Sequence, residues 1–206
     1  MSLPLVELIV GHLKEGVTTA HPSFKKLRDA CALGGLTKQT YGVAVENPRK
    51  LYWVIHYETI TPKDFLSKWP SDFCDYAKEV GEIMTEEPVS YYLPRDSCDK
   101  LFPKATTDAR VTEIAIVEPK NADDLEYYKE VQRDAVDAQA AESTAHEGWY
   151  SLIKTEKGVW TGVIFVGWDS AEAHNAAAAK NAALLQPFHG VAALVWLVHV
   201  SMTDHV

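Results

Sequence analysis

Short apolar runs alternate with helical patterns along the first half of the chain. Runs rich in Val, Ile and aromatic residues predict strands at residues 5–13, 40–45, 51–57 and 89–93. Apolar residues at helical spacing predict a helix over 22–33, with Pro22 at its first position. A second helix is predicted to start after Thr61, break at Trp69-Pro70 and resume over 71–84.

The second half repeats the same order of elements. Strands are predicted at residues 111–117, 149–155, 160–168 and 192–200. Helices are predicted over 123–140 and from Ser170, its N-cap, to the breaker Pro187. Each half therefore reads strand, helix, strand, strand, helix, strand.

The halves also share local sequence. Residues 5–10 (LVELIV) resemble 111–116 (VTEIAI), and Tyr57-Glu58-Thr59 resembles Trp168-Asp169-Ser170. An internal repeat of this length indicates two copies of one structural unit. We expect a first repeat over 1–94, a polar linker over 95–109 and a second repeat over 110–206.

A βαββαβ unit folds into a four-stranded antiparallel sheet with both helices on one face, the ferredoxin-like arrangement. The strands are apolar on both faces, so the two sheets are expected to meet and form an α+β barrel within one chain. A mid-strand glutamate is least costly in a loosely packed layer, which places Glu7 and Glu113 between the sheets. The residues then expected to face the helices are His12, Trp53, Ile55, Tyr57, Thr112, Ile114 and Trp168.

Charge and cysteine content restrict the binding partners and the cellular compartment that we expect. The net charge of −9 and the scattered Lys and Arg argue against nucleic acid and against an anionic membrane surface. No apolar stretch reaches the length of a membrane span. The three cysteines form no CxxC pair, which favours a reducing, cytoplasmic setting, and Cys98 in the polar stretch is expected to be an exposed thiol.

Residues 163–174, VIFVGWDSAEAH, resemble a known family. The aromatic–acid–Ser end of a strand followed by a helix opening Glu-Ala-His is similar to the dimeric α+β barrel proteins, in particular the antibiotic-biosynthesis-monooxygenase-like domains. Residues 51–59 carry a looser version, and tandem forms of this length resemble fungal proteins of secondary metabolism. The resemblance implies cofactor-free oxygenation of aromatic molecules, or polyketide cyclisation, with haem-degrading relatives as another branch.

Proton removal from a phenol or activated carbon requires a base with a pKa near neutral, usually a histidine. His174, near a helix N-terminus under Trp168, and His12, grouped with Trp53 and Tyr57, are the candidate bases. His199 on the last strand is a third. For each, a structural or capping role is the competing interpretation.

The alanine-rich helix over 173–185 either packs closely on its sheet or leaves a cavity. We expect a pocket in the second repeat, walled by Trp168, Trp196 and Ile114, with His174 at its edge. Close packing would instead favour the first repeat, around His12, or a non-catalytic protein.

The function expected from these patterns is a cofactor-independent oxygenase or cyclase acting on an aromatic or polyketide-like molecule. A non-catalytic binding or scaffolding protein and a haem-binding protein are the alternatives. No motif for a nucleotide, flavin or metal is present, so no cofactor or metal is expected. We expect a monomer, in which the repeats take the place of a dimer, or a homodimer.

Overall fold

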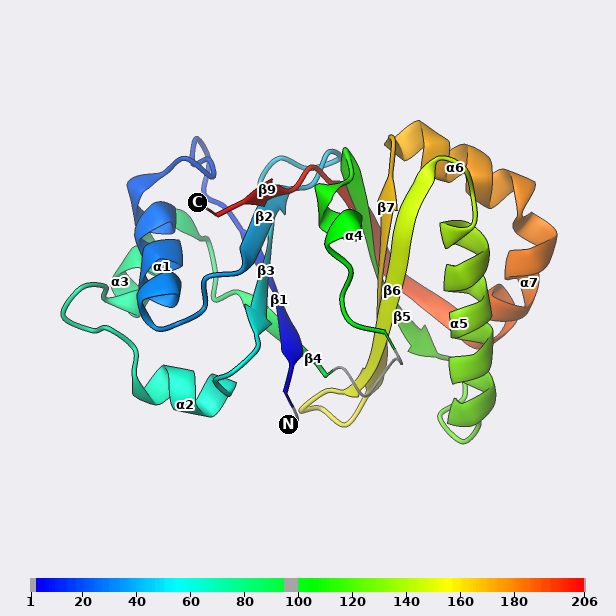
Figure 1. The fold of residues 1–206 in the computed structure, drawn as a ribbon, viewed down its shortest axis with the longest axis horizontal. Helices are drawn as coiled ribbons and strands as arrows, with labels where there is room; N and C mark the ends of the chain where they lie inside the picture. Colours follow the sequence, from blue (N-terminus) through cyan, green and yellow to red (C-terminus); the bar gives the residue numbers. More distant parts are fainter. Residues whose placement is uncertain (1–2, 95–99, 206) are drawn as a thin grey trace. The chain divides into compact units, whose positions relative to one another are not determined.

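The computed structural model describes residues 3–94 and 100–205 as an α+β protein with two antiparallel sheets (Figure 1). The chain divides into two compact units. The first contains the described residues up to Pro94 and the C-terminal segment from Thr203, and the second ends at Met202. Cys98 and the start of the predicted linker lie outside the described residues. Within those residues, no helix has the length and apolar character that a bilayer crossing requires.

The first unit carries a five-stranded sheet in the order β4-β1-β3-β2-β9. Its elements are β1 (Leu5–His12), α1 (Pro22–Leu33), β2 (Gln39–Val43), β3 (Lys50–Tyr57), α2 (Pro62–Ser67), α3 (Tyr76–Ile83), β4 (Val89–Pro94) and β9 (Thr203–Asp204). The Thr61 side chain accepts a hydrogen bond from the Asp64 amide at the start of α2, as its predicted N-cap role requires.

The second unit carries a four-stranded sheet in the order β6-β7-β5-β8. Its elements are α4 (Lys104–Asp108), β5 (Val111–Pro119), α5 (Leu125–Ala140), β6 (Ala145–Lys154), β7 (Trp160–Trp168), α6 (Ala171–Lys180), α7 (Ala182–Val191) and β8 (Ala192–Val200). Counted within each unit, the four main strands have the same order: second, third, first, fourth. Every strand pair in both sheets is antiparallel.

Two predicted helix boundaries are wrong. The break near Trp69-Pro70 is wider than predicted, because α3 begins only after its N-cap Asp75. The helix predicted to end at Pro187 is instead two helices, α6 and α7, and Pro187 lies inside α7. Proline has no backbone N–H to donate to the carbonyl four residues earlier, that of Ala183, which is an exposed residue.

Part of the predicted linker is folded against the sheet of the second unit. The Trp149 indole N–H donates to the Lys100 carbonyl at 3.0 Å, and the Phe102 ring lies 5.1 Å from the rings of Trp149 and Phe165. Helix α4 follows and packs on β6 and β7. This segment therefore covers part of the second sheet, where the sequence predicted only a connection.

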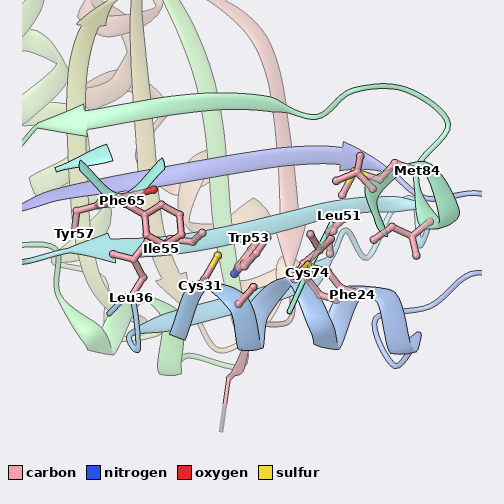
Figure 2. Close-up of a cluster of buried hydrophobic side chains, with 14 of the residues drawn as sticks. Phe24, Cys31, Leu36, Leu51, Trp53, Ile55, Tyr57, Phe65, Cys74 and Met84 are labelled. Atoms are coloured by element: carbon pink, nitrogen blue, oxygen red, sulfur yellow. The ribbon is translucent and has the colours of Figure 1, made fainter. Parts of the chain in front are cut away.

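The face assigned to the two mid-strand glutamates is also wrong. Glu7 pairs across from Ile55 and shares its face with Trp53 and Tyr57, whose rings pack on Phe24 of α1 and on Phe65 of α2, respectively (Figure 2). Glu113 likewise pairs across from Val166, on the face that packs against helices α5 and α6. Both carboxylates lie on the helix-facing side of their sheets.

The strand residues next to these glutamates in sequence consequently face the other way. His12, Thr112 and Ile114 were expected on the helix side, but alternation along β1 and β5 places them on the opposite faces. Trp53, Ile55, Tyr57 and Trp168 lie on the helix side as predicted.

Helix α4 approaches β7 so closely that one position has no room for a side chain. A Cβ on Gly167 would meet the Ala109 Cβ at 2.9 Å and the carbonyl oxygens of Thr106 and Ala105 at 3.0 and 3.1 Å. The same segment is fixed by the Thr112 hydroxyl, which donates to the Thr106 carbonyl at 2.8 Å.

We expect Gly167→Ala to lower the free energy of unfolding by about 1–3 kcal/mol, because backbone atoms of α4 must move to admit the methyl group. Gly81→Ala is the matched control. Gly81 lies in helix α3 with open space around it, so this variant should gain about 0.5–1 kcal/mol. Urea unfolding followed by tryptophan fluorescence measures both changes. An unchanged midpoint for Gly167→Ala would contradict the close packing of α4.

Candidate functional site

Two of the residues predicted for the second-repeat site come together and two do not. Trp168 ends β7 and His174 lies in the first turn of α6, with ring centroids 5.3 Å apart. Ile114 pairs with Phe165, and Trp196 pairs with Ile116, on the opposite face of the sheet. The pocket predicted from Trp168, Trp196 and Ile114 is therefore wrong in two of its three walls.

The start of helix α6 aims His174 at the sheet. Ser170 caps the helix, and its hydroxyl oxygen accepts from the Ala173 amide at 3.1 Å. The His174 amide donates to the Ser170 carbonyl at 3.2 Å, which fixes the first helical turn. The His174 residue is only 5% exposed, so its imidazole lies in the core rather than on the surface.

The imidazole meets a buried carboxylate and a second histidine. The Trp168 indole N–H donates to Glu113 Oε2 at 2.9 Å, and the same oxygen lies 3.4 Å from His174 Nε2. On its other side, His174 Nδ1 lies 2.9 Å from His199 Nε2. We call this row of three titratable side chains the Glu113–His174–His199 relay.

Strand register brings the ends of the relay together. His199 on β8 lies directly across from Glu113 on β5, so both side chains share the helix-facing side. Glu113 and His199 are 2% and 5% exposed. The sequence predicted Glu113 between the sheets and gave it no site role. The sequence feature that could have indicated a role for Glu113 is the repeat itself, which places a glutamate in the middle of the first strand of both halves.

Burial sets the protonation of this cluster. Removal from water raises the pKa of Glu113 to about 7, and the hydrogen bond from Trp168 offsets part of that rise. Burial, with a smaller effect from the charge of His199, lowers the pKa of His174 to about 4. Near neutral pH, His174 is therefore a neutral imidazole, and Glu113 is a carboxyl group that readily gains or loses a proton.

A neutral imidazole with one donor and one acceptor nitrogen can pass a proton along such a row. If Glu113 is protonated, it can donate to His174 Nε2 once their 3.4 Å separation shortens to hydrogen-bond length, and His174 Nδ1 then donates to His199. Gain of a proton at His199 and loss at Glu113 reverse these roles. The three groups of the relay can thus act together as one base, because a proton gained at one of them can be passed to another.

An exposed carboxylate lies near the His199 end of the relay. Glu172, in the first turn of α6, has a lowered pKa to which the nearby His199 makes a small contribution. The larger causes of that lowered pKa are hydrogen bonds from the Glu172 backbone and from Ser170. A proton that reaches His199 is therefore near a solvent-exposed carboxylate.

The first unit contains the same scaffold with different chemistry. Tyr57 ends β3 as Trp168 ends β7, and its hydroxyl donates to Glu7 Oε2 at 2.7 Å. Phe65 stands four residues after the cap Thr61, as His174 stands four after Ser170. Tyr92 lies across from Glu7, as His199 lies across from Glu113. The equivalent of the relay in the first unit therefore has no imidazole.

The site predicted in the first repeat does not assemble. His12 pairs with Lys50 on the face opposite Trp53 and Tyr57. The Trp53 indole donates instead to the Gln39 side chain at 3.1 Å. His12 and the two aromatic residues therefore cannot act on one ligand within the helix-facing layer.

The alanine-rich helix contacts the core of the second unit through Ala177 and turns other alanines to solvent. Ala177 is buried in the core with Trp168 and Val166. The exposed alanines of this stretch are Ala176, Ala179, Ala182 and Ala183. Their small side chains face solvent, so they free no volume inside the second unit.

The geometry of the relay does not suit metal binding. Both ring nitrogens of His174 are directed at protein partners, namely His199 and Glu113. Across the residues described in the structure, no three His, Cys, Asp or Glu side chains are placed to hold a metal ion.

Solved structures share this fold at low sequence identity. A protein described as "Putative monooxygenase" from Fusobacterium nucleatum is 9% identical, with a TM-score of 0.63 over 98% of this chain and 93% of its own. An anthrone oxidase-like protein is 13% identical, with a TM-score of 0.55 over 98% of this chain and 94% of its own. A heme-binding protein from Thermus thermophilus is 8% identical, with a TM-score of 0.55 over 98% of this chain and 92% of its own.

These neighbours share the α+β fold of this chain. No protein-family model and no curated protein matches the sequence. At these identities the likeness extends to the fold alone.

The relay predicts an unusual pH dependence of stability. A carboxyl whose pKa rises on folding binds more protons in the folded state, so Glu113 lowers the free energy of unfolding as pH rises from 4.5 to about 7. A histidine whose pKa falls on folding has the opposite effect, so His174 raises it as pH rises from about 4 to 6.5. The two contributions oppose each other where the ranges overlap.

Glu113→Gln removes the contribution of Glu113 to the pH dependence of stability and leaves that of His174. Relative to the native protein, its free energy of unfolding should rise by on the order of 2–3 kcal/mol between pH 4.5 and 7. Urea unfolding at a series of pH values measures this difference. Glu118→Gln, on the same strand but partly exposed, is the control and should show a constant difference. A constant difference for Glu113→Gln as well would rule out the raised pKa.

Proposed function

We propose that the protein is a cofactor-independent enzyme that removes a proton from a small aromatic or polyketide-like molecule, leading to oxygenation or cyclisation. The observation that carries this proposal is the buried Glu113–His174–His199 relay. It supplies the neutral imidazole of His174, with His199 beside it, and a carboxyl group whose pKa, about 7, suits proton transfer near neutral pH.

In this proposal His199 accepts the proton of the substrate, His174 passes a proton on through its two ring nitrogens, and Glu113 receives or returns it. Trp168 holds the Glu113 carboxylate through its indole N–H and presents a ring beside His174. The lowered pKa of His174 keeps the imidazole ready to accept a proton rather than already charged. His12, Trp53, Tyr57, Ile114 and Trp196 have no place in this site.

Oxygenation needs only the substrate's electrons and O₂. For an anthrone, loss of a C–H proton gives a carbanion that reduces O₂, and the balanced products are the anthraquinone and one water molecule. The fold shared with a monooxygenase-type protein and an anthrone oxidase-like protein supports this class of reaction. Cyclisation of a polyketide-like chain would begin with the same proton removal.

A haem-binding function fits the site less well. One structural neighbour is described as heme-binding, and haem iron is commonly held by an imidazole nitrogen. His174 has no nitrogen to offer, because Nδ1 contacts His199 and Nε2 faces Glu113. A non-catalytic binding protein is the other alternative, and it predicts no turnover with any substrate.

We also propose that the two units are tandem ferredoxin-like repeats, residues 1–94 and 110–206, that form an α+β barrel within one chain. Support comes from their common strand order and from the equivalent positions of Glu7 and Glu113. Such a chain needs no partner copy to complete the barrel, so a monomer or a homodimer follows. A role in secondary metabolism is part of the same proposal.

Turnover of anthrone tests the function. The native protein should consume O₂ and form anthraquinone above the protein-free rate, and His174→Gln and His199→Gln should each lower kcat by about 10²–10⁴-fold. Glu113→Gln should also remove the rise of kcat/KM with pH through about 7, because only a carboxylate can take the relayed proton. An oxygen electrode and absorbance of the product give both measurements.

The first unit provides the matched control. Tyr92→Phe changes the residue equivalent to His199 in the unit without imidazoles, so kcat should stay unchanged. No oxygen uptake by the native protein with anthrone, and no proton exchange on a polyketide-like diketone, would contradict the enzymatic proposal.

A further inference from the structure

One strand at the edge of the first sheet, β9, is only two residues long and is followed by a histidine. The strand pairs with residues 40–41 of β2 and lies beside that strand (Figure 1). The next residue, His205, donates its amide hydrogen to the Gln39 carbonyl at 2.9 Å, which extends the pairing by one bond. Because this backbone pairing is short, the side chain of His205 can decide whether the segment stays in place.

The imidazole of His205 lies against helix α1. Its side chain is 8% exposed, and its Nδ1 atom accepts a hydrogen bond from Arg28 Nε at 3.4 Å. The other ring nitrogen, Nε2, lies 3.6 Å from Asp29 Oδ1. Because Nδ1 is the acceptor, the ring is neutral in this arrangement and carries its hydrogen on Nε2.

Arg28 is fixed in place beneath that ring. The residue is 5% exposed, and its guanidinium carbon lies 4.3 Å from the centre of the Phe24 ring of α1 and 4.0 Å from that of Tyr41 of β2. An arginine stays charged in proteins, so its Nε is always a donor. Protonation of His205 would therefore set an N–H group and a second positive charge against the Arg28 side chain.

The charged groups around the ring act in both directions. Burial is the largest cause that lowers the pKa of His205, and the charge of Arg28 lowers it further. Asp29 raises this pKa, but its carboxylate also pairs with Lys25 at 2.7 Å, and the Lys25 charge has a weaker lowering effect. Asp204, on β9 itself, has an exposed carboxylate. The net direction is downward, so the docked segment favours the neutral ring.

We propose that β9 is an acid-released strap: protonation of His205 detaches residues 203–205 from β2. A histidine whose pKa falls on docking binds fewer protons when docked, so docking is strongest above pH 6.5 and weakens as the pH falls below that value. Release leaves the edge of β2 open to pairing by another extended segment. The strap acts in the first unit and does not depend on the relay or on the proposed activity.

NMR of the full chain tests the strap through amide hydrogen exchange and through titration of the ring. Between pH 7.5 and 5.5, the protection factor of the His205 amide should fall by about three- to tenfold, since protonation favours the released state. The Leu36 amide, which donates to the Cys31 carbonyl in the same unit, is the internal reference and should keep its protection. The His205 ring should titrate below pH 6.5.

Three variants separate a switch from simple fraying. His205→Asn keeps an acceptor near the position of Nδ1 but gains no proton, so the amide at that position should be equally protected at both pH values. Asp29→Asn removes the group that favours the charged ring, so it should lower the titration midpoint of His205 further. His189→Asn changes an exposed histidine of the second unit and should behave as the native protein does.

Three outcomes would overturn the proposal. The first is a His205 midpoint at or above pH 6.5. The second is equal protection of the native His205 amide at both pH values. The third is a fall in protection in His205→Asn as large as in the native protein, which would show that another group releases the segment.

Discussion

A carboxyl group placed in the helix-facing core of the second unit is the constraint to which its neighbours respond. A charged carboxylate removed from water is costly unless it is neutralised or hydrogen-bonded. Glu113 meets that demand with the indole of Trp168 and the imidazole of His174, which come from the end of β7 and the start of α6. The strand end, the capped helix and the register of β8 all serve to place partners around this one group.

The first unit meets the same demand with hydroxyl groups. Glu7 takes hydrogen bonds from Tyr57, Tyr92 and Ser90, and its pKa is raised by burial in spite of them. Its neighbour Phe65 offers no proton acceptor. One scaffold thus holds a buried acid twice, once beside hydroxyl groups and once beside imidazole rings. Only the second arrangement places basic ring nitrogens in a row with the acid.

The sequence predicted the elements well and the faces poorly. Alternation separates the side chains of β1 and β5 into two sets, but it does not say which set meets the helices. Glu7 and Glu113 were assigned away from the helices because a buried charge seemed costly there. The partners that reduce this cost, Tyr57 in one unit and His174 in the other, lie far away in sequence. Strand register, which the sequence does not reveal, brings His199 opposite Glu113.

The short strand β9 changes how the units are connected. Thr203 and Asp204 pair with Tyr41 and Thr40 of β2, so the chain leaves the first unit, builds the second and returns to the first sheet. In topological terms the second unit is an insertion. A pulling force on the two ends of the chain would act first on the few hydrogen bonds between β9 and β2. The unit that carries the relay would feel the load only after that strand had detached.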